Sequence, residues 1–399
     1  MDDFAPPAHG VQGMSAWWLA IPAVVCAVSA VYPWLGAVLV ARWLREASGA
    51  VETLPPVTLL RPLKPGVPDL RGKLEELARA MRPGDQLVLG AAADSAEFKT
   101  CRALQGAFPE REIVVVSCRE GAAVNPKISK LVQMEPECRH GRLILSDSEA
   151  LIDAAWLDAF RAEWEDHAVD VLTTGYRFTG ATNWPQRLDA TPALLALWPG
   201  LALMRRWGRV DFTLGACTGL RQRDLTELGG WRALGNFLAE DRELGAALAA
   251  RGRSLRLAAI VTTLDADPLT WRDWWRHQRR LAVTYRVSAP WGFAGMIFTH
   301  GSPAALVLAL APGEAGWRPW CVGGAGFFFL VRWLAARRLA RTLEFPIPAL
   351  GLALLLAGVV ETVAWALSWL PSRIWWSGRW WRVADRGKLV ATPHGGSAR

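Results

Sequence analysis

Two acidic side chains stand two residues apart where an apolar run ends, in the stretch LILSDSEALI. They are Asp147 and Glu149. In extended backbone, residues at this spacing point to the same side. Two carboxylates on one side can bind a single hard cation, and a cation that keeps several waters and bridges a diphosphate is Mg²⁺ or Mn²⁺. The pattern therefore indicates a metal-assisted phosphate site at the mouth of a buried strand.

The same residues also have a purely structural interpretation. Asp147, Ser148 and Glu149 precede the helical pattern EALIDAAWLDAFRAEW. Asp and Ser are preferred residues at the start of a helix, where their side chains accept hydrogen bonds from free backbone N–H groups. Spacing alone leaves both interpretations open.

The elements that position these carboxylates alternate along residues 51–264. Short apolar runs, typical of strands covered on both faces, alternate with amphipathic helix candidates such as DLRGKLEELARAM. This alternation predicts an α/β fold with a mostly parallel, Rossmann-like sheet, in which ligands bind at the carboxyl ends of the strands. The expected strands are Val57–Leu63, Gln86–Ala92, Glu112–Cys118, Arg142–Asp147 and Val169–Gly175.

One apolar stretch precedes this region. Trp17–Ala41 carries no charge over 25 residues, more than the roughly 20 needed to cross about 30 Å of hydrocarbon. Arg42 and Arg45 follow it and favour a cytosolic location for the next domain. We therefore expect an integral membrane protein with a cytosolic catalytic domain, in the inner membrane if the chain is bacterial.

Three more apolar stretches follow: Pro290–Ala311, Pro319–Val331 and Phe345–Leu370. Glu361 is costly in lipid and is expected to face protein or the interface. One span before the domain and three after it would leave the basic C-terminal segment outside, so one stretch is re-entrant or interfacial, or the charge bias fails here. The shorter Thr191–Met204 run contains Pro199 and is expected to be an interfacial helix.

The composition of the chain limits the classes of partner that we expect it to bind. The chain is 52% hydrophobic with 23 Trp, and its net charge is +8. Anionic lipid headgroups are the expected counter-charge, and no nucleic-acid partner is expected because no helix-turn-helix, zinc-finger or RNA-binding signature occurs. The six cysteines form no CxxC pair, which argues against a zinc site or a disulfide framework.

Six motifs in order resemble one enzyme group. They are VTLLRPLKP, NPKISKL, LSDSE, LAEDRELG, WWRHQRRL and the tail WSGRWWRV. The series resembles the family 2 and family 21 glycosyltransferases of GT-A fold, most closely ceramide glucosyltransferases and the hopanoid-associated glycosyltransferases of bacteria. The resemblance covers almost the whole chain.

The resemblance divides the chain into six segments. They are an N-terminal tail (1–16), a transmembrane helix (17–41), a GT-A domain (51–265), an interfacial amphipathic segment (266–289), membrane helices (290–370) and a basic C-terminal tail (371–399).

The resemblance also implies donor-side residues. Asp147 and Glu149 match the family's D-x-D motif and would bind Mg²⁺ or Mn²⁺ with the diphosphate of a UDP-sugar. Glutamate in place of the second aspartate keeps the charge and lengthens the reach. Further donor-binding candidates are Pro62, Lys64, Asp94, Lys127, Glu240, His277, Gln278 and Arg280.

Asp241 occupies the place of the family's general base, which must lie within hydrogen-bond reach of the hydroxyl it activates. Arg280 matches the arginine of the motif (Q/R)-x-x-R-W, whereas His277 replaces its first residue and Leu281 its tryptophan. The segment Asp211–Trp231 matches the family's small-residue stretch, in which Gly215 permits close approach of a ligand.

The sequence thus predicts a membrane-embedded inverting glycosyltransferase that moves a sugar, glucose being favoured, from a UDP-sugar to the hydroxyl of a lipid, most closely ceramide. Three alternatives stay open: N-acetylglucosaminyl transfer to a hopanoid, a processive polysaccharide synthase, and a non-catalytic lipid-binding scaffold.

Overall fold

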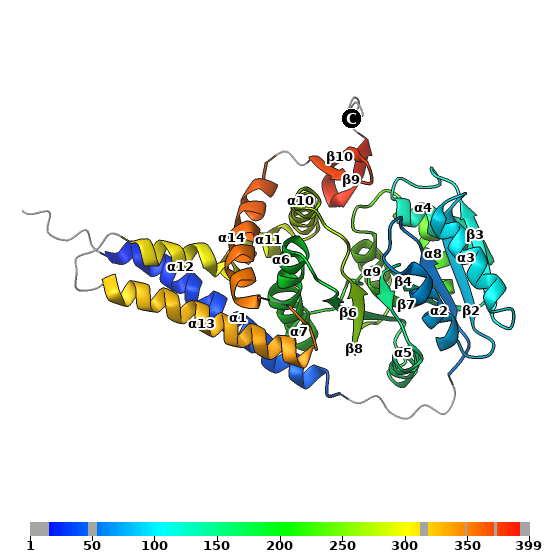
Figure 1. Cartoon of the computed structure of the whole chain (residues 1–399), viewed down its shortest axis with the longest axis horizontal. Helices are drawn as coiled ribbons and strands as arrows, with labels where there is room; N and C mark the ends of the chain where they lie inside the picture. Colours follow the sequence, from blue (N-terminus) through cyan, green and yellow to red (C-terminus); the bar gives the residue numbers. More distant parts are fainter. Residues whose placement is uncertain (1–15, 47–53, 312–317, 348, 371–372, 392–399) are drawn as a thin grey trace, which may run out of the picture.

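The computed structural model describes residues 16–46, 54–311, 318–347, 349–370 and 373–391. Figure 1 shows an α/β body, a bundle of long helices that projects from one side of it, and a small C-terminal sheet beside the body. The expected N-terminal tail lies outside the described residues except for Ala16.

The main sheet has the strand order β3-β2-β1-β4-β7-β6-β8-β5. Its strands are β1 (Thr58–Pro62), β2 (Gln86–Ala92), β3 (Glu112–Cys118), β4 (Arg142–Ser146), β5 (Ala150–Leu151), β6 (Val171–Thr179), β7 (Cys217–Arg221) and β8 (Leu255–Asp265). Strands β1 to β4 are mutually parallel, as are β6 and β8, whereas β7 and the short β5 run antiparallel to their neighbours. The mostly parallel α/β sheet is confirmed.

Both faces of this sheet are covered, which explains the near-continuous apolar runs. Leu59 and Ile144 pack into a core on one face, whereas Leu60 and Leu143 pack into a core on the other. The elements that follow the strands in the body are α2 (Leu70–Ala80), α3 (Ala96–Ala107), α4 (Pro126–Met134), η2 (Glu135–Glu137), α5 (Ala154–Asp166), α8 (Gln222–Leu228), η4 (Trp231–Leu234) and α9 (Glu240–Ala250).

The segment between β6 and β7 joins the sheet to the projecting bundle. It comprises α6 (Trp184–Pro192), η3 (Ala193–Leu197) and α7 (Trp198–Trp207). Trp198 is fully buried; its Nε1 donates to the Tyr176 carbonyl of β6 at 2.8 Å, and its ring lies 5.4 Å from that of Trp43. The expected interfacial helix over 191–204 is therefore largely wrong, because sheet and bundle cover this apolar run from two sides.

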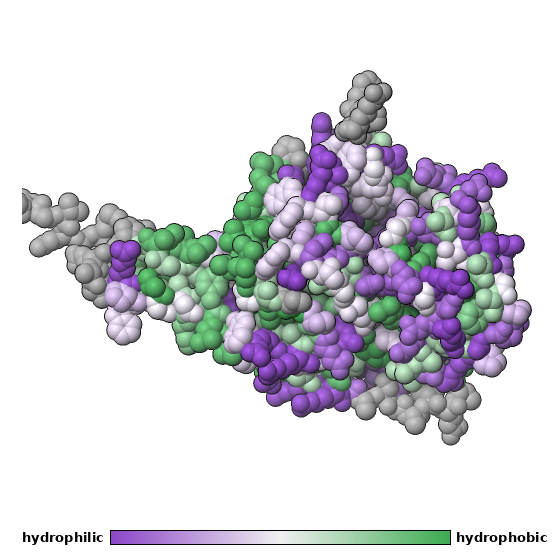
Figure 2. Space-filling view, in the orientation of Figure 1, coloured by the Kyte–Doolittle hydropathy of each residue, from purple (hydrophilic) through white to green (hydrophobic). Residues whose placement is uncertain are grey.

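Four helical stretches are long and apolar enough to cross a membrane, and Figure 2 shows the hydrophobic surface along the bundle. These helices indicate membrane association. They are α1 (Ala20–Trp43, preceded by η1, Ala16–Leu19), the broken stretch α11 (Pro290–Gly295), η5 (Met296–Thr299) and α12 (Gly301–Leu310), then α13 (Arg318–Thr342) and α14 (Leu350–Ser368).

The fourth stretch has a different direction from the rest. In Figure 1, α1, α12 and α13 run side by side, whereas α14 runs crosswise beside α6 and α10. With α1 leading to the body, α12 and α13 would cross a membrane outward and back while α14 lies crosswise, so the chain would end on the side of the body. The arrangement fits the interfacial alternative for one apolar stretch, with α14 as that stretch.

The amphipathic segment 266–289 forms α10 (Trp271–Ser288), which packs on two sides. Trp274 packs with α6 and α14, whereas Val283 packs on the C-terminal sheet. That sheet consists of β9 (Arg373–Trp376), β10 (Arg379–Val383) and β11 (Leu389–Ala391), with η6 (Asp385–Gly387) between the last two.

The C-terminal segment is thus docked on the body. The backbone N–H of Leu238 donates to Gly387 at 2.9 Å, and that of Leu389 donates to Asn236 at 2.8 Å. The small sheet thereby braces the chain just before α9, which begins at Glu240.

Candidate active site

The acidic motif lies in a turn at the carboxyl end of β4. The Ala150 N–H donates to the Asp147 carbonyl at 3.2 Å, so the extended backbone expected for Asp147–Glu149 is wrong. The helix-cap interpretation is also wrong, because α5 begins at Ala154 and Asp153 caps it by accepting from the Trp156 N–H. Asp147 and Glu149 are therefore not needed to start a helix.

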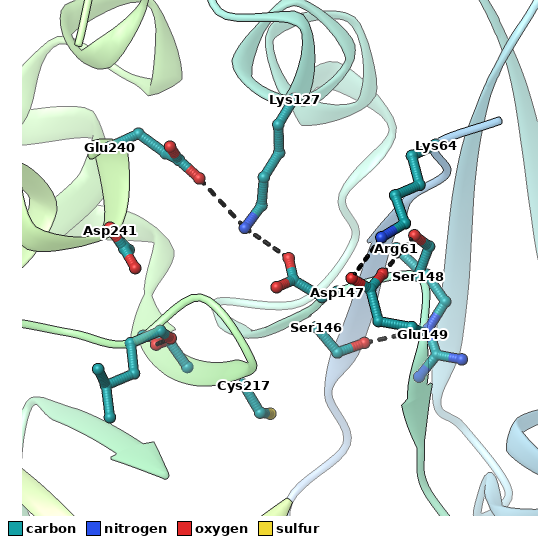
Figure 3. Close-up of polar contacts among 12 residues, drawn as sticks. Arg61, Lys64, Lys127, Ser146, Asp147, Ser148, Glu149, Cys217, Glu240 and Asp241 are labelled. Carbon is teal, nitrogen blue, oxygen red and sulfur yellow. Dashed lines mark hydrogen bonds and ion pairs between the residues drawn. The ribbon is translucent and has the colours of Figure 1, made fainter. Parts of the chain in front are cut away.

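Asp147 belongs to an ion-pair network that spans three elements. Lys127 Nζ lies 2.7 Å from Asp147 Oδ1 and 3.2 Å from Glu240 Oε1, as Figure 3 shows. Asn125 places Lys127 by capping α4 and also donates to Glu240 Oε2 at 3.0 Å. One lysine thus links the β4 turn to the start of α9.

Glu149 belongs to a second ion-pair network. Lys64, just after β1, lies 2.7 Å from Glu149 Oε1 and 2.5 Å from Asp267 Oδ2. Ser148 Oγ also donates to Glu149. Four carboxylates in the two networks therefore share two lysines, which leaves two negative charges uncompensated within them.

Asp241 shares a hollow with Asp147 and Lys127. A Cβ added at Gly215 would lie 3.2 Å from Asp147 Oδ2, 3.4 Å from Asp241 Oδ2 and 3.6 Å from Lys127 Nζ. The absence of a side chain at Gly215 therefore lets all three groups gather around one point of the backbone. The hollow there is a cavity of about 10 Å³, and Lys127 and Asp241 are among its lining residues. Figure 3 shows Asp241 and Asp147 on opposite sides of Lys127. Thr213 fixes this part of α9, because its Oγ1 donates to the Asp241 carbonyl at 2.7 Å.

Burial and like charge set the ionisation of these carboxyl groups. Burial, followed by the charge of Glu240, raises the pKa of Asp241 to about 6. Burial also raises the pKa of Asp147, although Lys127 opposes the change. Burial also acts to raise the pKa of Glu149, but the charge of Lys64 holds that pKa below its ordinary value. The pKa of Asp241 is thus raised toward neutral pH, the direction that favours a carboxylate as a proton acceptor.

A buried cation lies beneath this cluster. Arg61 of β1 is fully buried; its Nε donates to Ser146 Oγ at 3.1 Å, and its two terminal nitrogens have no partner among the described residues. Burial lowers the pKa of Arg61 to about 10, against the opposing charges of Cys217, Glu149 and Asp147. Sequence reasoning did not single out Arg61, although it lies in the motif VTLLRPLKP.

Three predicted residues lie on α10, and two of them contact one carboxylate that was not predicted. His277 Nδ1 lies 3.1 Å from Asp189 Oδ1, and the buried Gln278 amide donates to the same oxygen at 2.9 Å. Asp189 thus anchors α10 to α6, and the Gln278 amide is engaged in that anchor. Arg280 has no ion pair among the described residues, although the charges of Glu240 and Asp241 act on it.

The remaining predicted residues lie at the same edge of the sheet but outside these networks. Pro62 ends β1 and is buried. Asp94 is exposed after β2 with φ of 60°, and its side chain has no ion pair or hydrogen bond in the described part of the chain. The unpredicted Asp267 and Asp189 were detectable only as acidic residues near expected helix and strand ends, a weak signal.

A divalent cation fits this donor set. The described residues include no group of three or more His, Cys, Asp or Glu side chains placed to ligate a metal. Mg²⁺ is usually bound by one or two carboxylates together with substrate phosphates and water. Asp147 and Glu149, in networks with two uncompensated negative charges, meet that requirement.

A family model matches most of the chain. The model of the family "Glycosyl transferase family 21" matches residues 21–389. No curated protein sequence matches the chain.

Among solved structures, the mannosyltransferase PcManGT from Pyrobaculum calidifontis, in complex with GDP-Man and Mn²⁺, aligns with a TM-score of 0.51 at 18% identity, over 88% of this chain and 99% of that one. S. aureus TarS 1-349 in complex with UDP-GlcNAc aligns at 0.39 and 13% identity, over 86% and 98%, too low a TM-score to support any inference. The first likeness supports the GT-A fold.

Proposed function

The chain belongs to glycosyl transferase family 21 and is a glycosyltransferase, and we propose that it transfers glucose from UDP-glucose to the primary hydroxyl of ceramide with inversion at the anomeric carbon. The observation that carries this proposal is the hollow at Gly215, which Asp147, Asp241 and Lys127 face together. A nucleotide-sugar transferase needs a diphosphate site and a base beside one sugar, and candidates for both lie around Gly215.

Asp147 and Glu149 would hold a divalent cation at this site, which when bound would neutralise charge on the departing diphosphate. The Mn²⁺ in the mannosyltransferase of similar fold supports this part of the proposal, as does its GDP-Man for a nucleotide-sugar donor. Lys64 and Lys127 already occupy the carboxylates as counter-ions, so donor binding would redistribute these lysines toward phosphate oxygens.

Arg280 is our candidate for the diphosphate's second contact. Burial lowers the pKa of Arg280, with the charges of Glu240 and Asp189 opposing. The side chain is half-buried and has no ion-pair partner among the described residues. A half-buried, unpaired guanidinium beside acidic residues is suited to bind an anion that arrives with the substrate. Trp376 of β9 lies 6.0 Å from the Arg280 guanidinium and supplies an aromatic contact where Leu281 replaces the family's tryptophan.

Asp241 would take the proton from the acceptor hydroxyl as the new sugar–oxygen bond forms and the bond to UDP breaks. Its pKa of about 6 leaves it largely ionised at neutral pH while keeping it basic enough to accept a proton. General-base catalysis of this kind contributes about 10²–10⁴ in rate.

The lipid part of the proposal is supported by the membrane helices beside the site. Tyr285 of α10 is 43% exposed, yet burial raises its pKa to about 12, assisted by the charges of Asp241 and of Glu361 on α14. We place the acceptor's headgroup beside Tyr285, between Asp241 and the crosswise α14.

We place the catalytic domain on the cytosolic side. The body-side ends of α1 and α13 carry five arginines, in agreement with the positive-inside bias: Arg42, Arg45, Arg337, Arg338 and Arg341. The C-terminal sheet packs on the same body, so its basic residues obey the same bias.

The alternatives differ in measurable ways. N-acetylglucosaminyl transfer to a hopanoid uses the same chemistry on another donor and acceptor. A processive synthase needs a polymer channel that is enclosed by helices. Three helices side by side and a crosswise fourth are few to enclose one. A non-catalytic scaffold would bind UDP without releasing it from any UDP-sugar.

The test is UDP release by the full chain in nanodiscs, with UDP-glucose or UDP-N-acetylglucosamine crossed with ceramide or a hydroxylated hopanoid. We expect release with UDP-glucose and ceramide, and none with ceramide methylated on its primary hydroxyl, the matched control. Release only with the other donor and the hopanoid would select the first alternative. A ladder of products would select the synthase, and no release with any pair would contradict transfer to these lipids.

A further inference from the structure

A second concave surface lies at the body-side end of α13, distant in sequence from the acidic motif. It is a groove of about 480 Å³ whose lining includes Trp333, Arg337, Arg341, Glu344, Phe345 and Leu350. It shares no lining residue with the hollow at Gly215. We call it the arginine groove.

The groove carries uncompensated positive charge. The side chains of Arg337 and Arg341 have no ion pair or hydrogen bond in the described part of the chain, and the Arg337 guanidinium lies 4.6 Å from the centre of the Trp333 ring. Glu344, the groove's carboxylate, is paired with Arg177 at 2.9 Å. Two guanidinium groups one helical turn apart therefore lack a counter-ion within the described chain.

The groove also has an apolar side that continues along the helix. Phe345 is buried in its floor, and Leu330 and Leu334 are 49% and 42% exposed on the preceding turns of α13. Because α13 is a candidate membrane span, these leucines would face acyl chains while Arg337 and Arg341 lie at headgroup depth. A soluble anion would gain nothing from this apolar extension.

We propose that the arginine groove binds an anionic phospholipid, its phosphate between Arg337 and Arg341 and its acyl chains along the outer face of α13. Clusters of basic side chains at the end of a membrane helix attract anionic headgroups, each charge contributing about fivefold in affinity. Trp333 suits the boundary, since its ring is apolar and its N–H is polar. This site is independent of the proposed sugar transfer and would act as an anchor even if that function were wrong.

The test uses the full chain in detergent, titrated with phosphatidylglycerol or phosphatidylcholine, with bound lipid counted by native mass spectrometry. We expect preferential binding of phosphatidylglycerol, reduced about fivefold by Arg337→Gln and about 25-fold by the double change Arg337→Gln/Arg341→Gln. Arg338→Gln is the matched control, because Arg338 is exposed on the same turn but does not line the groove.

Three results would overturn the proposal. A loss as large in Arg338→Gln would show that only the overall charge of the helix end matters. A double variant that keeps its preference, with an unchanged melting temperature, would remove the groove from consideration. Inorganic phosphate that displaces phosphatidylglycerol at equal concentration would show an anion site with no use for acyl chains.

Discussion

The acidic cluster at the end of β4 and the arginine groove at the end of α13 differ in how far their charges are neutralised by other side chains. In the cluster, Lys64 and Lys127 each bridge two carboxylates, so half of the counter-charge for these four groups is built into the chain. In the groove, Arg337 and Arg341 have no ion-pair partner among the described residues. The first arrangement suits a ligand that comes and goes, because lysines stabilise the carboxylates in its absence. The second suits a ligand that is always present at a membrane surface.

The largest expected effect comes from removing the base from the acidic cluster. We expect Asp241→Asn to lower kcat by about 10²–10⁴ while leaving the melting temperature unchanged or higher, because an amide costs less to bury than a carboxylate. UDP release and thermal unfolding measure the two effects. Glu243→Gln, on the first turn of the same helix and paired with Arg242, is the control. Full activity of Asp241→Asn would refute the base assignment.

The next effect is on the charge balance of the cluster. We expect chelation of divalent ions to lower the rate of the full chain by about 10², with recovery on adding Mn²⁺ or Mg²⁺, because the diphosphate then leaves without a counter-ion. Asp147→Asn should need more metal for half-maximal rate. Activity that survives exhaustive chelation would mean that the lysines alone neutralise the diphosphate.

A smaller effect follows from the ionisation of Asp241. Only its carboxylate accepts a proton, and burial raises its pKa to about 6, so kcat/KM should rise about tenfold between about pH 5 and about pH 7 and then level off. The folded state binds this proton more tightly than the unfolded state does, so the same group lowers stability as pH rises from about 4 to about 6. A pH profile in which kcat/KM does not rise between these pH values would contradict the role of Asp241.

The smallest effect tests the groove. Glu344→Gln removes the groove's carboxylate and leaves Arg177 without this counter-charge, so phosphatidylglycerol should bind up to about fivefold more tightly. Stability should change by less than about 0.5 kcal/mol, because the Glu344 side chain is 79% exposed and exposed ion pairs contribute little. Weaker binding of phosphatidylglycerol by this variant would mean that Glu344 orders the groove instead of opposing it.

The strands of the body could be predicted because their signal is local. Gln86–Ala92 and Glu112–Cys118 match β2 and β3 at both ends, since each is an unbroken apolar run. The strands β5, β7 and β8 were not among those predicted. For β7 the reason is that CTGLR is short, small and half polar. Its place between β4 and β6 comes from pairing with both neighbours.

The candidate site was predicted as a list of residues, and its geometry came from the fold. The extended-backbone argument for Asp147 and Glu149 was wrong, although both residues lie in the cluster. What orients them is a turn closed at Ala150 together with two lysines from other elements. The C-terminal segment was similarly predicted from its composition to be a basic tail. In the structure, tryptophans on alternate sides of β9 and β10 allow it to pack on α10.

By itself the sequence determined where five strands lie, the apolar spans and the motif residues, because hydropathy period and residue type are properties of neighbouring positions. Only the tertiary structure decided that Lys127, Asp147 and Asp241 face the same hollow over Gly215. Those residues are far apart in the chain, and their convergence depends on β7 running antiparallel beside β4 and on the start of α9. No local pattern carries that information, since it arises from the order in which strands pair.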